Sequence, residues 1–488
     1  MKNYTTKPFL LVELLEKFTP AELKNLEALV ACSYFNTDKH VAKLLKALKR
    51  KILHKRSLRY DNLAEIYPDV FNDIPASNTT LSEQQTNAIR VKMSVLTRLA
   101  ERFLILENLQ EKEAVQTELL HEKLLEKEQF RLYERDDKKR RKQLDNQLKD
   151  LNYYEHKCKI EYSRLNYMYR TGEWIKEDNL PELTRSWDTF YLIHRLSLYL
   201  TQLSFQEVSA RSDYDFSAIE AIEALAKTTP YHQIPQVQIY LVAIRLIKDK
   251  KDEIYAQLLD LLSIYRHEIP SHKLNDFYLV LGNFCISQIK QGKINYYRRL
   301  FDLYRVMDEQ ELLLEDGLIT PGKIRNITSS ACRVDEFEWA SQFIEKYYPF
   351  TRKNVQDDIR NFNMGVIAFY QKNYADAIDY LYDVDSVDLN YDLNRRMMLV
   401  KSHYEVETEY KETTAQIFRS VEKYIQQNKL LTQRNKTAYK NFIRLLINLY
   451  RIRHHATKMT TQSLYTKLEK AELLSDKQWL LEKIDELG

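Results

Sequence analysis

NFNMGVIAFYQKNYADAIDYL, from Asn361 to Leu381, contains two short amphipathic segments separated by the polar residues QKN. Apolar residues recur three or four positions apart in each segment, and this spacing places them on one face of a helix. Two helices this short bury too little apolar surface to be stable alone. The stretch therefore indicates that further helix pairs pack beside it.

Related segments occur elsewhere in the second half of the chain. FEWASQFI, beginning at Phe337, has the same spacing as YADAIDYL, beginning at Tyr374, and YKETTAQI, beginning at Tyr410, follows it more weakly. Fainter copies begin at residues 216, 254 and 294, so successive copies are separated by 38, 40, 43, 37 and 36 residues. A period of this size, filled each time by two helices, predicts an α-solenoid.

The opening stretch resembles a tetratricopeptide repeat. Met364 and Gly365 stand where the consensus has Leu-Gly, and Tyr374 stands at the aromatic position that opens the second helix. Ala377 occupies the small-residue position where the two helices of a repeat touch, since a bulky side chain there would push them apart. The resemblance extends over about residues 185–430. The departures from the consensus are Asn361 for Trp, Lys372 for the turn glycine and Leu389 for the terminal proline.

The whole chain is also similar to uncharacterised bacterial helical proteins with degenerate repeats, and this resemblance implies no activity. The composition agrees with an all-α fold. Only seven glycines and ten prolines occur in 488 residues, whereas sheet proteins and nucleotide-binding folds need glycine at tight turns and phosphate loops. We therefore expect a tetratricopeptide-like α-solenoid of helix pairs, together with an N-terminal helical module and a long charged helical hairpin.

Breaks in the apolar pattern predict three parts: residues 1–75 as the N-terminal module, 81–180 as the charged helices, and 185–488 as the superhelix with C-terminal capping helices. In the N-terminal module the apolar pattern predicts three or four short helices. One of them begins at Thr19, which with Glu22 forms a capping box. A linker is expected from Tyr67 to Glu83, where two prolines accompany Asn, Ser and Thr residues.

Residues 111–170 are highly charged and predict a long helical hairpin or a short coiled coil. The run ERDDKKRRK, from Glu134 to Lys142, is expected at the tip of the hairpin or on a solvated face. A long helix from about Leu81 to Leu109 precedes this region.

The motifs of common enzymes do not occur in the sequence. It contains no glycine-rich phosphate loop, no G-x-S-x-G sequence and no H-E-x-x-H pair. One E-x-x-H motif, Glu118 with His121, is a single copy in a glutamate-rich helix, whereas a di-iron bundle needs two such motifs. We therefore expect no enzyme activity, no metal and no cofactor.

The four cysteines lie far apart, which suits a reducing compartment. No apolar run approaches the roughly 20 residues of a membrane helix, and no cleavable signal segment is expected. We expect a cytoplasmic protein that does not enter a membrane. Its oligomeric state stays open.

Tetratricopeptide arrays bind partners along a concave groove, and the resemblance implies that this chain binds a protein or peptide there as a scaffold. Packing of the same aromatic side chains against the next repeat is an equally favoured interpretation. The implied groove residues are Phe362, Asn363, Val366, Phe369, Tyr370, Arg395 and Arg396.

The alternative function is binding of nucleic acid or another polyanion through residues 423–468, which contain ten Lys or Arg and no Asp or Glu. Apolar residues from Phe442 to Ile452 predict a buried helix face, with a basic stripe on the opposite side. A solvated face balanced by acidic residues of a neighbouring helix is the competing interpretation. A second basic cluster, Lys49 to Arg59, has a helix end as its simpler explanation. The stripe consists of Lys436, Lys440, Arg444, Arg451 and His455, with Arg434 near its start.

Overall fold

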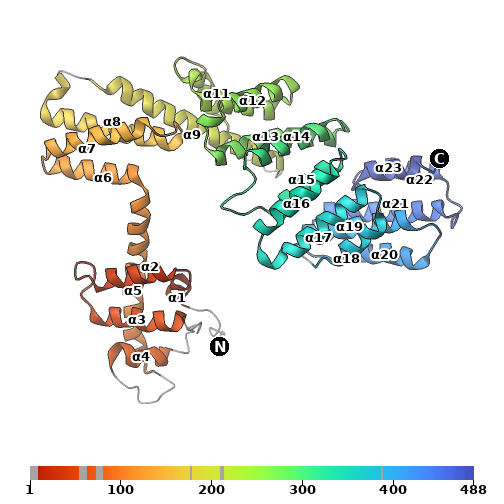
Figure 1. Ribbon diagram of the computed structural model, residues 1–488, viewed down its shortest axis with the longest axis horizontal. Helices are drawn as coiled ribbons and strands as arrows, with labels where there is room; N and C mark the ends of the chain where they lie inside the picture. Colours follow the sequence, from red (N-terminus) through yellow and green to blue (C-terminus); the bar gives the residue numbers. More distant parts are fainter. Residues whose placement is uncertain are drawn as a thin grey trace. The chain divides into compact units, whose positions relative to one another are not determined.

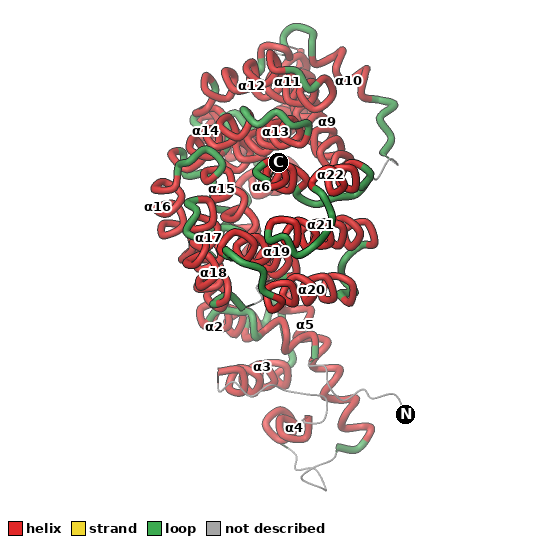
Figure 2. The backbone as a smooth tube through the Cα atoms, turned by 90° about the vertical axis from the view of Figure 1, so that its right-hand side faces the viewer, coloured by secondary structure: helices red, strands yellow, loops and turns green. Residues whose placement is uncertain are grey.

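The computed structural model describes residues 9–53, 63–72, 81–175, 178–208, 214–385 and 388–487. Within these ranges the chain is all-helical, and its only β-type pairing is one isolated bridge between Glu315 and Leu318 (Figure 2). No helix of the described residues is long and apolar enough to cross a membrane. The chain divides into two compact units: the first comprises Met1–Gln147 and Asn152–Asp188, and the second comprises Leu148–Leu151 and Thr189–Gly488.

The described residues of the first unit contain α1 to α7, α8 except its first residue, and the start of α9 (Figure 1). Four short helices at the N-terminus agree with the sequence expectation. These helices are α1 (Leu10–Leu15), α2 (Pro20–Ala31), α3 (Lys39–Leu53), α4 (Leu63–Phe71), α5 (Glu83–Glu111), α6 (Glu113–Glu126), α7 (Phe130–Asp145), α8 (Leu151–Thr171) and α9 (Leu180–Val208).

Helix α2 begins as the sequence predicts. Thr19 is the N-cap, its side chain accepts from the backbone N–H of Glu22, and the Glu22 carboxylate accepts from the backbone N–H of Thr19. The two orphan donors at the helix start are thereby satisfied reciprocally. Residues of α5 from Ile89 to Phe103 pack into the same apolar core as α1–α4. This part of α5 therefore belongs to the same core as the four N-terminal helices.

The linker expected from Tyr67 is wrong at its start, because α4 continues to Phe71 with Pro68 inside it. Proline removes one helical hydrogen bond and disfavours the turn before it. Tyr67 and Val70, which flank Pro68, are buried in the core, and this burial outweighs the local cost. Residues 73–80 of the expected linker lie outside the described residues.

The expected long hairpin is also wrong, because three helices, α6, α7 and α8, occupy this region. The charged run from Glu134 to Lys142 lies inside α7, and Asp137 within it is buried. Ion pairs to neighbouring helices, including Arg140 with Glu113 and Arg141 with Glu161, account for the difference. Five of the nine residues of this run are exposed, as a solvated face requires, and the inter-helix ion pairs involve its half-buried arginines.

The second unit continues α9 and contains α10 to α23 in its described residues (Figure 1). The bounds are α10 (Ile219–Ala226), α11 (Pro235–Asp249), α12 (Asp252–Ile264), α13 (Ser271–Lys290), α14 (Tyr296–Glu309), α15 (Pro321–Cys332), α16 (Phe337–Tyr347), α17 (Gln356–Tyr370), α18 (Tyr374–Tyr382), α19 (Leu389–Val406), α20 (Glu412–Gln427), α21 (Gln433–Arg453), α22 (Thr461–Glu469) and α23 (Lys477–Asp485).

Helices of the second unit pack mainly on helices close to them in sequence. From α11 to α21 each helix contacts the next one, and α11 also contacts α13, α15 contacts α17, and α17 contacts α19. The even-numbered helices α10 to α20 begin at or within three residues of the six positions 216, 254, 294, 337, 374 and 410 that the sequence pattern marked. Helices α19 to α23 share one apolar core, to which α23 contributes Trp479, Leu480 and Ile484.

Four of the odd-numbered helices end in the same way. Lys250, Gly292, Asp335 and Lys372, at the ends of α11, α13, α15 and α17, all have positive φ angles. After Lys372, the N–H of Asn373 donates to the carbonyl of Ala368, which completes a Schellman turn. Lys372 has the left-handed backbone conformation that glycine adopts most easily. The tetratricopeptide consensus has its turn glycine at this position.

Gly365 of α17 lies against α18 with no room for a side chain. A Cβ atom there would lie 2.9 Å from Cγ of Leu381 and 3.3 Å from Cβ of Tyr380. Ala377 of α18 is completely buried. The two small residues that fixed the repeat register therefore lie where two helices approach closely.

We predict that Gly365→Leu destabilises the α17–α18 pair by at least about 2 kcal/mol, because overpacking a tight contact typically costs 1–3 kcal/mol or more. Gly322→Leu is the matched control, since no atom lies within 4 Å of a Cβ at Gly322, and we expect it to change stability by less than about 1 kcal/mol. Hydrogen exchange of the α17 and α18 amides measures the difference. Equal protection in the two variants would contradict the close approach.

Candidate functional site

The groove residues implied by the tetratricopeptide resemblance lie mostly inside the protein. Phe362, Val366 and Phe369 of α17 are buried, and Asn363 is 0% exposed. The ring of Phe362 lies 4.7 Å from that of Tyr391. The amide of Asn363 donates to the carbonyl of Ile359 at 2.7 Å. These four side chains join α17 to its neighbouring helices, so their burial gives no support to a direct contact with a partner.

Tyr370 is half-buried, with the Arg333 guanidinium 5.1 Å from its ring centre, and burial raises the pKa of its phenol. Arg395 and Arg396 of α19 both contact the buried carboxylate of Asp392, at 2.9 and 3.0 Å. Although burial alone would raise the pKa of Asp392, hydrogen bonds from Tyr424, Arg396 and Arg395 hold it below its usual value. The two arginines thus balance an acid within the fold.

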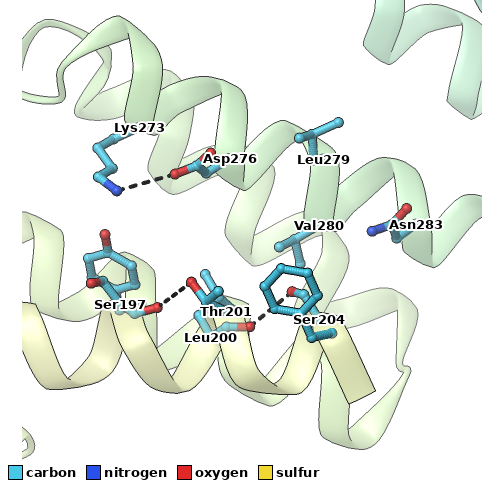
Figure 3. A pocket seen from close by; sticks show the side chains of 11 residues that line it. Ser197, Leu200, Thr201, Ser204, Lys273, Asp276, Leu279, Val280 and Asn283 are labelled. Carbon is cyan, nitrogen blue, oxygen red and sulfur yellow. Dashed lines mark hydrogen bonds and ion pairs between the residues drawn. The ribbon is translucent and has the colours of Figure 1, made fainter. Parts of the chain in front are cut away.

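A groove does occur on odd-numbered helices, but further toward the start of the second unit. A cavity of about 300 Å³ lies between α9 and α13, with Tyr240 of α11 in its wall (Figure 3). Leu279 of α13 and Phe205 of α9 line it and are 43% and 57% exposed. Large apolar side chains with this exposure, in a concave surface rimmed by polar groups, are typical of binding sites.

The rim of this α9–α13 groove carries polar side chains in regular order. Lys273 and Asp276 of α13 form an ion pair at 3.3 Å. The hydroxyls of Thr201 and Ser204 donate to carbonyls of their own helix, so their oxygens keep lone pairs directed at any ligand. The sequence repeat does not reveal this groove, because its six marked positions lie at the starts of the even-numbered helices. The useful signal is the series of positions 273, 276, 280 and 283, which share one face of a helix.

The predicted basic stripe lies on α21. As expected, the buried face of this helix includes Phe442, Leu445, Leu446 and Leu449. Three residues of the stripe, Lys436, Lys440 and Arg444, line one cavity of about 380 Å³ between α20 and α21. Arg451 does not line it. That side chain is half-buried, and its charge contributes to the lowered pKa of Glu412, after hydrogen bonds from Tyr410 and Arg419.

The assignment of His455 to the stripe is wrong, because α21 ends at Arg453. His455 has a φ of 54°, and its N–H donates to Ile452 while that of Ala456 donates to Arg451. These two bonds form a Schellman turn, which takes His455 off the helix surface. A rotation of 100° per residue, which would place His455 on the stripe, applies only to residues of the helix itself.

The competing interpretation, a balanced solvated face, holds for part of the stripe. Arg444 pairs with Glu422 of α20 at 2.6 Å, and Lys436 donates to the carbonyl of Gln426 at 3.3 Å. Lys440 forms no ion pair with any of the described residues. In the second basic cluster, Lys49, Arg50 and Lys51 pair with acids of α2 and α4, and residues 54–59 lie outside the described residues.

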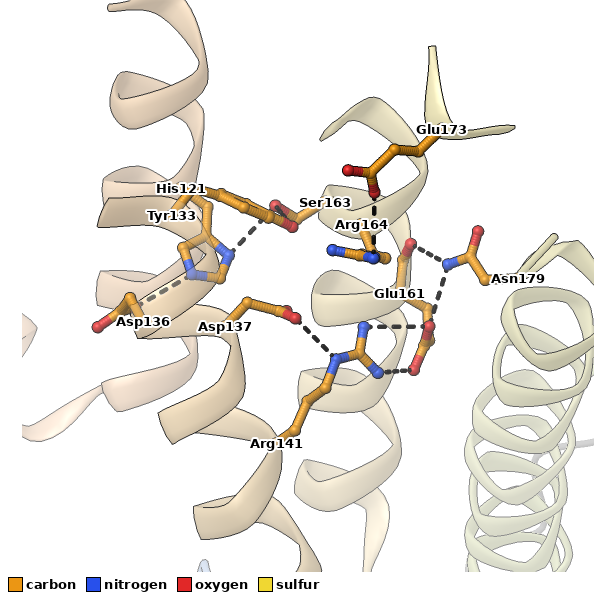
Figure 4. A network of polar contacts seen from close by, with 10 residues as sticks. All are labelled: His121, Tyr133, Asp136, Asp137, Arg141, Glu161, Ser163, Arg164, Glu173 and Asn179. Atoms are coloured by element: carbon orange, nitrogen blue, oxygen red, sulfur yellow. Dashed lines mark hydrogen bonds and ion pairs between the residues drawn. The ribbon is translucent and has the colours of Figure 1, made fainter. Parts of the chain in front are cut away.

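The first unit contains a buried polar network between α6, α7 and α8 (Figure 4). Arg141 contacts Asp137 and both oxygens of Glu161, and Asn179 donates to the Glu161 carboxylate at 3.0 Å. Although burial opposes it, the bonds and attraction from Glu161 and Asp137 raise the pKa of Arg141. The network explains why a highly charged segment forms compact helices.

His121, from the E-x-x-H motif, is 0% exposed and lies between Asp136 and Ser163. Its Nε2 is 3.0 Å from Asp136 and its Nδ1 is 3.2 Å from the Ser163 hydroxyl. Ser163 also borders a cavity of about 730 Å³. A histidine between a serine and an aspartate is also the arrangement of a hydrolytic triad. The surroundings of Ser163 decide whether this cluster could catalyse acyl transfer.

Ser163 lies in the interior of α8, where backbone N–H groups are bonded to the preceding turn. Acyl transfer needs free donors aimed at the developing oxyanion, and the backbone around Ser163 has none to offer. The cluster therefore joins three helices. No group of His, Cys, Asp and Glu residues in the described ranges has the arrangement of a metal site.

No family model matches the chain, and no similar curated protein or solved structure was found.

We predict that acid destabilises the first unit through His121. Burial lowers the pKa of His121, although Asp136 and Asp137 oppose this effect and Arg140 reinforces it. The unfolded chain then binds more protons than the folded chain, so stability is present above a pH of about 6.5 and declines as pH falls below it. His156 contributes with the same sign.

Hydrogen exchange of α6–α8 at pH 7 and pH 5, corrected for intrinsic rates, measures this effect. In the His121→Gln variant we expect a smaller loss of protection between the two pH values than in the original chain. His267→Gln, at an exposed position of the second unit, is the control. An unchanged pH dependence in His121→Gln would show that His121 does not carry the effect.

Proposed function

We propose that the second unit is an α-solenoid of tetratricopeptide-like helix pairs, and that it binds a segment of a partner protein as a non-catalytic scaffold. The α9–α13 groove is the observation that carries the proposal. It combines exposed Leu279 and Phe205 with a rim of hydroxyl, amide and charged groups. Such a surface is typical of protein recognition, where apolar anchors supply affinity and polar groups set orientation.

Three observations support the repeat arrangement. The even-numbered helices begin at the spacing of the sequence repeat. The odd-numbered helices α11 to α17 share a left-handed residue at their ends. Contacts run between helices that are neighbours or next neighbours in sequence. In solenoids each repeat contacts only its neighbours, which leaves a continuous surface for a partner.

The chemistry of the groove specifies the occupant. An apolar side chain of the bound segment packs against Leu279 and Val280, and its backbone amides hydrogen-bond to Asn283 and to hydroxyls of α9. The charges of Lys273 and Asp276 neutralise each other, so the groove does not demand a charged segment. The proposal places the binding in the cytoplasm, where reduced cysteines persist.

We predict that Leu279→Arg abolishes this binding. Peptides selected from a display library on the full chain provide the ligand, and fluorescence polarisation measures their affinity. We expect a rise in Kd of at least about tenfold, since an interface anchor is worth more than 1 kcal/mol. Affinity should change little between 50 and 200 mM salt, because the contact is apolar.

Ile264→Arg of α12 is the matched control, because Ile264 is also a large exposed aliphatic residue but does not line the groove. We expect unchanged affinity in this variant. Selection of no peptide, or equal loss of affinity in both variants, would rule out the α9–α13 groove as the binding surface.

A further inference from the structure

The cavity between α20 and α21 gathers cations in one place. Lys436, Lys440 and Arg444 are spaced four residues apart and line the same wall. Gln433 and Asn441 of α21 and Gln426 of α20 contribute side-chain amides to the cavity. Its volume of about 380 Å³ is in the range of small-molecule sites.

The charge of the α20–α21 cavity is not balanced by its own surroundings. Glu422 is the acid that pairs with Arg444, so three cations meet one carboxylate among the described residues lining or touching the cavity. The segment from residue 423 to 468 supplies no Asp or Glu. An excess of positive charge in a concave site attracts anions and raises their local concentration.

The placement of these cations works against the stability of the helix. Like charges four residues apart on a helix repel each other. Lys436 also lies close to the start of α21, whose first turn has no acidic residue, and the positive end of the helix dipole disfavours a cation there. A bound anion relieves both effects, because it attracts the lysines and the helix start together.

We propose that the α20–α21 cavity binds a chain of phosphate groups. Lysine and arginine spaced along the wall can each contact a separate phosphate, and side-chain amides can donate to phosphate oxygens. Among the described residues that line the cavity none is aromatic, so they offer no platform on which a nucleobase could stack. The site recognises the phosphates and not a base.

The ligand chemistry has two sources, a free oligophosphate or the backbone of a nucleic acid. Isothermal titration of the full chain with tripolyphosphate tests the first, and titration with a duplex DNA of mixed sequence tests the second. Tighter binding of tripolyphosphate identifies the small ligand, and tighter binding of the duplex identifies the backbone. Both affinities should fall with added salt, since phosphate contacts release counterions.

Three variants locate the site. Lys440→Gln should weaken tripolyphosphate binding about tenfold, because it removes one charge-assisted contact. Glu422→Gln should strengthen binding, because it frees Arg444 and removes the acid beside the cavity. Lys467→Gln, at an exposed position of α22 in the same acid-free segment, is the matched control and should change the affinity less than twofold.

The gain of affinity in Glu422→Gln keeps the test decisive even if Lys440→Gln impairs folding. No heat of binding for either ligand at millimolar concentration would overturn the proposal, and so would equal losses in Lys440→Gln and Lys467→Gln. Leu279→Arg should leave phosphate binding unchanged, so failure of this inference and failure of the α9–α13 groove are distinguishable.

Discussion

The close contact between successive helices is the constraint on which the second unit depends. At α17 and α18 it requires Gly365, because the side chain of Leu381 fills the space that a Cβ would need. A looser version of the same arrangement occurs at Gly282 of α13, where a Cβ atom would lie 3.6 Å from Cδ1 of Leu300. Since no helix pair can bury its apolar faces alone, each contact supports the next along the chain. The left-handed residues that end α11 to α17 allow the chain to reverse within a few residues and bring the partner helix back.

Charge is handled differently in the two units. In the first unit α7 carries both acids and bases: Asp136 contacts His121 of α6, Arg141 pairs with Glu161 of α8, and Asp137 pairs with Arg141 within α7. Burial of these groups is tolerated because their hydrogen bonds are largely completed within the network. In α21 Arg444 pairs with Glu422 of α20, whereas Lys440 forms no ion pair with any of the described residues. Acids thus accompany the bases in the polar network of the first unit, whereas residues 423–468 of the second unit contain no acid.

Aromatic side chains fill the space around α17, so the helix pair α17–α18 is not the one that offers a groove. Phe362, Phe369 and Tyr374 pack around α17 in edge or tilted contacts, and this packing fills the space between helices. Between α9 and α13 smaller side chains, Ser197, Thr201 and Ser204, face Leu279 and Asn283. Around α17 large side chains fill the space between helices, whereas the wall between α9 and α13 includes small side chains beside Phe205 and Tyr240.

The sequence by itself determined the helical class, the four N-terminal helices, the capping box at Thr19 and the starts of the even-numbered helices. These features depend on residues within a few positions of one another, so apolar period and capping chemistry carry them. Only the tertiary structure decided that charged side chains of α7 pair with α6 and α8, that Asn363 is buried, that His455 leaves α21, and that Lys436, Lys440 and Arg444 share a cavity. Each of these depends on contacts between helices or on where a helix ends, and periodicity along one helix does not encode which neighbour covers which face.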